Sequence, residues 1–193
     1  MAAPFPGRDP MASFQDRVVG ALRLQAATFE DVEHDPTAVS QAAIVVLAVG
    51  VAGVIGSMAY GLHAGSAIVV ILFGLIGWAV SSAVVWLVGT RLLPGKNTEA
   101  DYGQLLRVVG FAQAPGLFTV LGIIPILGWL VRIVVWVWTL VALVIAVRQA
   151  LDYDDTVKAV IVCVIAWVIM LVAWAMVGIL GFGAAMAGGA LTS

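Results

Sequence analysis

Few residues of this sequence could do chemistry, and three of them are polar side chains in or beside long apolar runs: Arg107, Gln113 and Arg132. Polar groups inside membrane segments usually face the interior of a bundle or a water-filled cavity. Because Arg107 and Arg132 lie near the ends of their runs, we expect both to extend their charged heads toward the membrane surface. Gln113 lies about two turns into its run. It stands just before Pro115-Gly116, which we expect to interrupt the helix. Such a break can expose carbonyl groups that bind an ion, or it can let two helices pack closely.

Catalytic motifs are missing from the chain. It has no Gly-x-Ser-x-Gly, no phosphate-binding loop and no His-Glu-x-x-His, and no Asp or Glu lies inside an apolar run. Asp152, Asp154 and Asp155 cluster beside Arg148 and Lys158 and could bind a divalent ion. We expect them instead to cap a helix in a solvated loop. The sequence therefore predicts that the protein is not an enzyme.

Metal, disulfide and nucleic-acid chemistry are also poorly supported. Cys163 has no second cysteine to pair with, and with only His34 and His63 beside it the ligands for a zinc site are too few. The 9 Lys and Arg against 11 Asp and Glu give a net charge of −2, so no basic excess is present to neutralise phosphates. We expect no cofactor and no nucleic-acid partner.

The composition places the chain in a lipid bilayer. Of its 193 residues 63% are apolar and 10% are charged, and the mean hydropathy is +1.11. A soluble domain has roughly 45–50% apolar and about 25% charged residues. A membrane β-barrel would need strands of about ten residues with alternating polarity, and no such alternation is present. The sequence therefore predicts an all-α integral membrane bundle.

Charged residues and turn signals divide the apolar sequence into five spans. A spanning helix needs about 20 mostly apolar residues. The run from 36 to 90 has no charged residue and is far too long for one crossing, so we expect a break at 60–65. Ile124-Pro125-Ile126-Leu127-Gly128 divides the run from 108 to 147. The expected membrane domain is 36–190, with spans near 38–60, 66–90, 105–123, 127–149 and 157–182. Thr98 with Asp101 has capping-box spacing before the third span.

The positive charges predict the orientation. Every Lys and Arg except Arg132 falls before the first span or close to the loops that follow the second and fourth spans. Because positively charged loops stay in the cytoplasm, we expect a multi-pass protein of the cell membrane, in bacteria the inner membrane, with a cytoplasmic N-terminus and an external C-terminus.

Two segments precede or shape the bundle. Residues 1–12 are expected to be a disordered extension, and 13–35 an amphipathic helix on the membrane surface or against the ends of the spans. Ser13 with Asp16 has capping-box spacing at its start, and Arg17 is placed on its polar side. In the first span, small residues recur every three positions at Gly50, Gly53 and Gly56. Such a face lets helices pack closely, within the chain or in a dimer.

Two motifs resemble those of a known family. One precedes the first span and the other lies in the third; their positions are Phe29, Glu30, Asp35, Pro36, Gly110, Phe111 and Pro115. They resemble bacterial members of the Yip family, membrane proteins named for Ypt/Rab GTPase interaction in eukaryotes. Gly110-Phe111 with Pro115 is similar to the family's Gly-Tyr-x-x-x-Pro motif, with Phe in place of Tyr. The resemblance covers roughly residues 14–182 and implies five spans with a cytosolic N-terminus. The Asp-Leu-Tyr-Gly-Pro motif of the eukaryotic members, which interact with prenylated Rab GTPases, is absent.

These observations favour a non-enzymatic, accessory or organising membrane protein. It would associate with a membrane-protein partner or with a second copy through its small-residue faces or its N-terminal helix. One alternative is a small oligomeric transporter or channel with a path near Gln113 and Pro115. Another is a protein that binds a lipid or a hydrophobic cofactor.

Overall fold

The structure is a computed structural model that describes residues 13–61, 67–96 and 98–191. The predicted extension at 1–12 and the centre of the predicted break at 60–65 lie outside the described residues. The described residues form helices and no strand, which confirms the all-α prediction. The elements are α1 Phe14–Leu22, α2 Ala26–His34, α3 Ala38–Met58, α4 Ala67–Leu87, the π-helical turn η2 Val88–Leu92, α5 Tyr102–Ala112, the 3₁₀ helix η3 Ala114–Ile123, α6 Pro125–Ala150 and α7 Thr156–Leu191.

Within the described residues, five segments are long and apolar enough to cross a membrane, as the sequence predicts. They are Ala38–Met58, Ala67–Leu92, Tyr102–Ile123, Ile126–Ala150 and Thr156–Ile179. Their ends lie within a few residues of the expected ones. The third span is α-helical as far as Ala112 and continues as a 3₁₀ helix from Ala114. The expected interruption at Pro115-Gly116 is therefore present, because proline lacks the amide hydrogen that an α-helix needs at this position.

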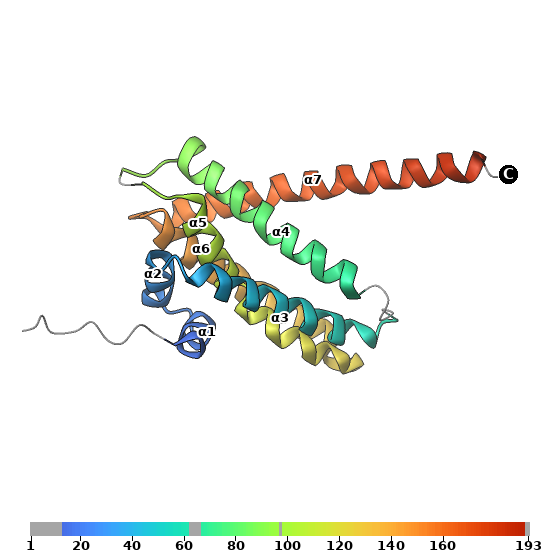
Figure 1. Cartoon of the computed structure of the whole chain (residues 1–193), viewed down its shortest axis with the longest axis horizontal. Helices are drawn as coiled ribbons and strands as arrows, with labels where there is room; N and C mark the ends of the chain where they lie inside the picture. Colours follow the sequence, from blue (N-terminus) through green and yellow to red (C-terminus); the bar gives the residue numbers. More distant parts are fainter. Residues whose placement is uncertain (1–12, 62–66, 97, 192–193) are drawn as a thin grey trace, which may run out of the picture.

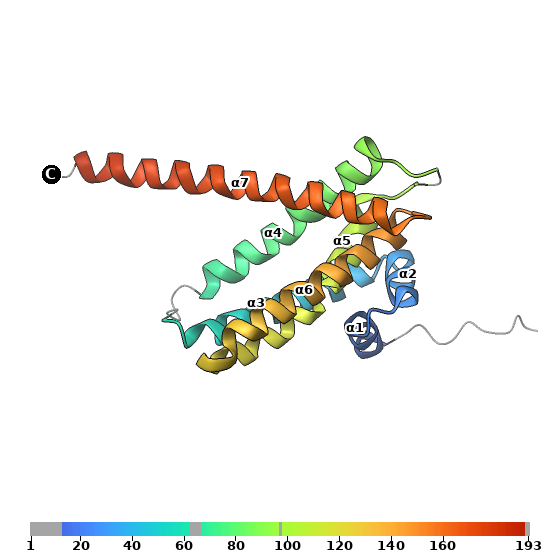
Figure 2. The same cartoon turned by 180° about the vertical axis from the view of Figure 1, so that it is seen from behind.

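The third span lies at the centre of the bundle. In its most apolar 18-residue stretch 56% of the residues are buried, whereas only 17% are buried in the corresponding stretches of the second and fifth spans. Its 3₁₀ part, η3, packs between α3 and α6. These are the two most extensive contacts between any pair of elements. The helix α7 runs away from the other spans toward the C-terminus (Figures 1 and 2).

The N-terminal segment forms two short helices instead of one. The predicted capping box of Ser13 and Asp16 begins α1. At its end, Leu24 adopts a left-handed conformation with φ of 59°. The amides of Leu24 and Gln25 donate to the carbonyls of Ala21 and Gly20, each at 3.0 Å. This is a Schellman motif, which usually has glycine at the left-handed position. A leucine there gave no sign in the sequence that the helix would end.

Another local correction concerns the start of α5. Its capping box consists of Asp101 and Gln104, with the backbone amide of Gln104 donating to the Asp101 carboxylate at 2.8 Å. Thr98, which was expected to form the box, uses its hydroxyl to donate to the carbonyl of Leu151 at 2.6 Å. That bond joins the loop before α5 to the loop before α7, so Thr98 connects two loops and does not cap a helix.

One end of the bundle, which we call the charged end, gathers α1, α2 and the loop segments 93–96, 98–101 and 151–155 (Figure 1). Bonds between these segments hold it together. Lys158 donates to the carbonyl of Pro94 at 2.5 Å, and Gln149 donates to the carboxylate of Glu30 at 3.1 Å. The opposite end is formed by the end of α3, the start of α4 and the junction of η3 with α6.

Candidate functional site: a buried polar network at the charged end

Arg17 is the most deeply buried charged side chain among the described residues, with 1% of its surface exposed. It lies three residues after Phe14 and four before Ala21, so the helical period places it on the inward side of α1. Its charge had favoured the polar side of the helix, and the structure corrects this expectation. Spacing at i, i+3 and i+7 was the signal that could have shown its burial.

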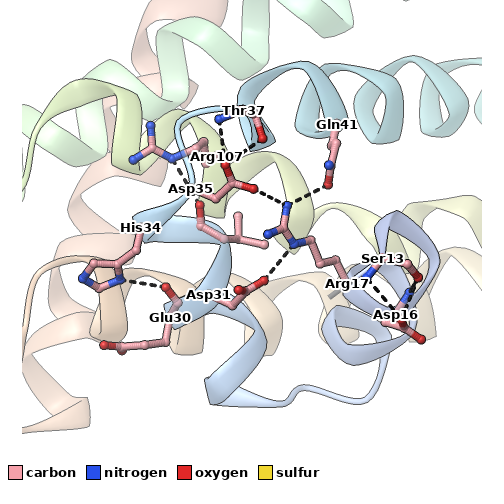
Figure 3. A network of polar contacts seen from close by, with 11 residues as sticks. Ser13, Asp16, Arg17, Glu30, Asp31, His34, Asp35, Thr37, Gln41 and Arg107 are labelled. Atoms are coloured by element: carbon pink, nitrogen blue, oxygen red, sulfur yellow. Dashed lines mark hydrogen bonds and ion pairs between the residues drawn. The ribbon is translucent and has the colours of Figure 1, made fainter. Parts of the chain in front are cut away.

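Three acceptors surround the Arg17 guanidinium (Figure 3). Nε lies 2.8 Å from the carboxylate of Asp31, and Nη1 lies 2.7 Å from that of Asp35 and 3.0 Å from the Gln41 amide oxygen. Asp35 also accepts from the backbone amide of Thr37 at 2.9 Å and from its hydroxyl at 2.6 Å. One side chain of α1 is thereby tied to α2 and to α3.

The charges of this network stabilise each other. Burial, the largest influence on Arg17, opposes its charged form, yet hydrogen bonds to Asp31 and Asp35 keep the pKa of Arg17 above its ordinary value. The hydrogen bond from Thr37, supported by the one from Arg17, holds the pKa of Asp35 below its usual range. Both groups therefore remain ionised across the physiological pH range, and the ion pair is a permanent connection.

Arg107, expected to extend toward the membrane surface, is instead buried at 7% exposure. Its Nε donates to the carbonyl of Val32 at 3.2 Å, and its Nη2 donates to the carbonyl of Glu33. The last carbonyls of a helix have no partner within that helix and carry its partial negative charge. The end of α2 satisfies the Arg107 guanidinium, so this side chain attaches α2 to α5.

Glu33 is a buried carboxyl group that the sequence analysis did not single out. Its Oε1 accepts from the Gln104 side chain at 3.3 Å, while its Oε2 has no hydrogen-bond partner in the described part of the chain. Burial raises the pKa of Glu33 to about 7. The nearby positive charges of His34 and Arg107 lower the pKa of Glu33, and the negative charges of Glu30 and Asp152 raise it.

This raised pKa predicts a pH-dependent stability. A carboxyl group with an ordinary pKa of 4.5 and a folded pKa of about 7 favours the fold below about pH 4.5 and loses that contribution as pH rises through about 7. Between pH 5 and pH 8 the wild type should lose about 2 kcal/mol of unfolding free energy relative to Glu33→Gln. Thermal unfolding in detergent across this range measures the difference. Glu99→Gln, at an exposed position that does not influence Glu33, should keep the wild-type pH dependence, and parallel curves for wild type and Glu33→Gln would contradict the prediction.

The family-motif residues other than Pro115 lie around this network. Phe29 and Phe111 are fully buried, and Phe111 meets Phe14 edge to face at 6.4 Å between ring centroids. At Gly110, an added Cβ would lie 2.7 Å from the Cβ of Ala42, so α3 and α5 approach each other closely there. Glu30 and Asp35 belong to the contacts already described, and Pro36 follows in the turn before α3. The two motifs, separated in sequence, thus meet where the N-terminal helices dock.

Other predicted positions are not brought into the network. Arg132 lies near the opposite end of the bundle, with its guanidinium 4.5 Å from the centroid of the Tyr60 ring. Gln113 lines a cavity within the bundle, and Pro115 and Gly116 are buried. At Gly116 an added Cβ would lie 2.5 Å from a methyl carbon of Val49.

The glycine face of α3 contacts neighbouring helices of the same chain. An added Cβ at Gly56 would lie 2.0 Å from the carbonyl oxygen of Thr119, and one at Gly50 would lie 3.4 Å from Ile71. At Gly53 the nearest such atom is the Thr119 hydroxyl, at 3.9 Å. Gly56 and Gly50 thus lie against η3 and α4, respectively.

The acidic loop before α7 forms an open hollow of about 570 Å³ at the charged end. It is lined by Arg148, Gln149, Asp152, Tyr153 and Asp154. Asp155 accepts from the backbone amide of Val157 at 2.9 Å and so caps the start of α7. Within the described residues no group of three or more His, Cys, Asp or Glu side chains could hold a metal ion.

A scan against protein-family models matches the Yip1 domain over residues 19–177. No curated protein and no solved structure matches the chain. The match includes most of the N-terminal helices, the Asp31, Asp35 and Gln41 partners of Arg17 but not Arg17 itself, and nearly all of the five spans. It extends over well more than half of the chain, in agreement with the two motifs and the five spans. The protein is therefore a multi-pass membrane protein that belongs to the Yip1 domain family.

Proposed function

We propose that this Yip-type protein is a non-enzymatic accessory that associates with another membrane protein or with a second copy of itself, using the outer faces of α4 and α7. The supporting observation is the difference in burial between the central third span and these two helices. Only 17% of the residues are buried in the most apolar 18-residue stretch of each of the two helices. The glycine face of α3 and the two N-terminal helices, which the sequence analysis considered for this role, are already occupied by contacts within the chain.

Several polar side chains have a structural role, which fits a non-enzymatic protein. Trp78 donates to the carbonyl of Leu106 and Trp86 to that of Ala100, each at 3.0 Å. Tyr153 donates to the carbonyl of Leu93 at 2.6 Å. Like Arg17 and Arg107, these groups hold segments of the chain together. In this proposal the charged end faces the cytoplasm, because nearly all Lys and Arg residues lie there.

Site-specific photo-crosslinking in native membranes tests the association. A photoreactive amino acid replaces Ile76 on α4 or Val172 on α7, which are 58% and 55% exposed. Matched controls are Ile133 on α6 and Ile44 on α3, at 52% and 51%. We expect a discrete protein adduct from the first two positions and lipid adducts alone from the controls. A coexpressed copy with a different tag tells a homo-oligomer from another partner, and lipid adducts alone at all four positions would reject the proposal.

A further inference from the structure

A cavity of about 340 Å³ lies where α4, α5, α6 and α7 meet. Gln113, in its lining, stands halfway along the span Tyr102–Ile123, so the cavity lies near the middle of the bilayer. Gly74 and Trp174, which also line it, are exposed, so the cavity reaches the outer surface of the bundle. Its volume is at the lower end of the range of small-molecule sites, about 300–1,000 Å³.

Two polar side chains face this cavity without a partner. Neither the Gln113 amide nor the Thr139 hydroxyl makes a side-chain hydrogen bond within the described part of the chain, although both are half-buried and both line the cavity. The Ser81 hydroxyl, also in the lining, donates to the carbonyl of Trp78 at 3.0 Å and can still accept a bond. A polar group without a partner is unfavourable in hydrocarbon, so a polar atom of a ligand in this cavity would stabilise the Gln113 and Thr139 side chains.

We infer that this cavity binds an uncharged amphiphile from the bilayer, one with an apolar body and a single hydroxyl or carbonyl group that bonds to Gln113 and Thr139. The lining contains no ionisable side chain, so a charged headgroup would have no counter-ion at this depth. The rest of the lining, including Leu143, Met170 and Trp174, suits an aliphatic or ring body.

Two neighbouring cavities lack this recognition chemistry. The cavity of about 230 Å³ between η3 and α6 and that of about 320 Å³ between α6 and α7 have no hydroxyl, carboxamide or charged group in their linings, whose hydrogen-bonding side chains are tryptophans and Cys163. Lipid chains can fill such hollows without selection. The combination of an open route from the bilayer with an unpartnered carboxamide and an unpartnered hydroxyl, which can both donate and accept, distinguishes the Gln113 cavity.

Photolabelling of the full chain in phosphatidylcholine nanodiscs tests this inference. The probes are hexadecanol with a diazirine beside the hydroxyl, the corresponding diazirine alkane and the corresponding fatty acid, and labelled peptides are mapped by mass spectrometry. We expect the alcohol to label the lining residues roughly fivefold more than the alkane, since one satisfied hydrogen bond is worth about that factor. The fatty acid should label them no better than the alkane.

Three variants identify the cause of the labelling. An added Cβ at Gly74 meets open space, so Gly74→Leu fits the fold and fills part of the cavity, and it should lower labelling by the alcohol roughly tenfold. Gly178→Leu, at another open helical glycine that does not line the cavity, should leave labelling unchanged. Gln113→Leu removes the amide with little change in volume, so alcohol and alkane should label equally while the melting temperature is kept.

The results that would overturn the inference are specific. Labelling by the alcohol that survives Gly74→Leu would place the probe elsewhere on the bundle. Equal labelling by alcohol and alkane in the wild type would mean that the cavity receives lipid chains without recognising a polar group. Preferential labelling by the fatty acid would reject the uncharged class of ligand.

Discussion

Replacing Arg17 by methionine should loosen the docking of the N-terminal helices on the bundle. The variant keeps most of the side-chain length but leaves the carboxylates of Asp31 and Asp35 without their buried cation. Removing one partner of a buried ion pair typically costs about 3–5 kcal/mol, because the remaining charge stays desolvated. We expect a lower melting temperature in detergent and faster amide hydrogen exchange throughout α1 and α2.

Arg23→Met is the matched control, because Arg23 ends the same helix but is exposed. It should change neither the melting temperature nor the exchange rates. Arg17→Lys should give an intermediate result, since lysine keeps the charge but cannot reproduce the planar geometry of the guanidinium. If Arg17→Met were as stable as Arg23→Met, the network would not be what holds the helices in place.

Two glycines of α3 should respond to alanine in opposite directions. At Gly56 the added Cβ would lie 2.0 Å from a backbone oxygen of η3, so helix and backbone must move apart. We expect Gly56→Ala to cost about 3 kcal/mol, the upper part of the usual range for overpacking. At Gly53 the nearest atom is 3.9 Å away, and alanine is favoured over glycine in a helix by about 1 kcal/mol. Gly53→Ala should therefore be neutral or slightly stabilising.

Thermal unfolding of both glycine variants in the same detergent measures this contrast. Intrinsic tryptophan fluorescence reports the transition, because tryptophans lie in three of the spans. Equal melting temperatures for the two variants would show that α3 and η3 are not in close contact at Gly56. The pair is informative because both changes add the same methyl group to the same helix.

The spans were predictable because their physical cause is local. Lipid excludes charged groups and unpaired backbone, so hydrophobic length and the positions of charges define each crossing. The break in the third span was predictable for a similar reason, since Pro115 acts on its own helix. The capping box of Ser13 and Asp16 depends only on residues three positions apart.

The docking network could not be predicted in the same way, because its contacts join residues distant in sequence. Arg107 was expected at the membrane surface on the basis of its own span, yet its partners are the final carbonyls of α2. The charge of Arg17 favours the polar side of the helix, whereas its spacing from Phe14 and Ala21 places it on the buried side. The sequence did offer one sign of a buried cation. Asp31 lies in α2 and Asp35 follows its end, four residues later, so both carboxylates lie on one side and favour a cation facing them.

The central position of the third span has a consequence for biogenesis. Its mean hydropathy is 1.5, whereas the other four spans range from 2.3 to 2.9. Taken alone, such a segment partitions weakly from the translocon into the membrane. The surfaces that cover it belong to α3, already synthesised, and to α6, which follows it directly. We therefore expect the third span to enter the bilayer together with these two helices, as one cotranslational unit.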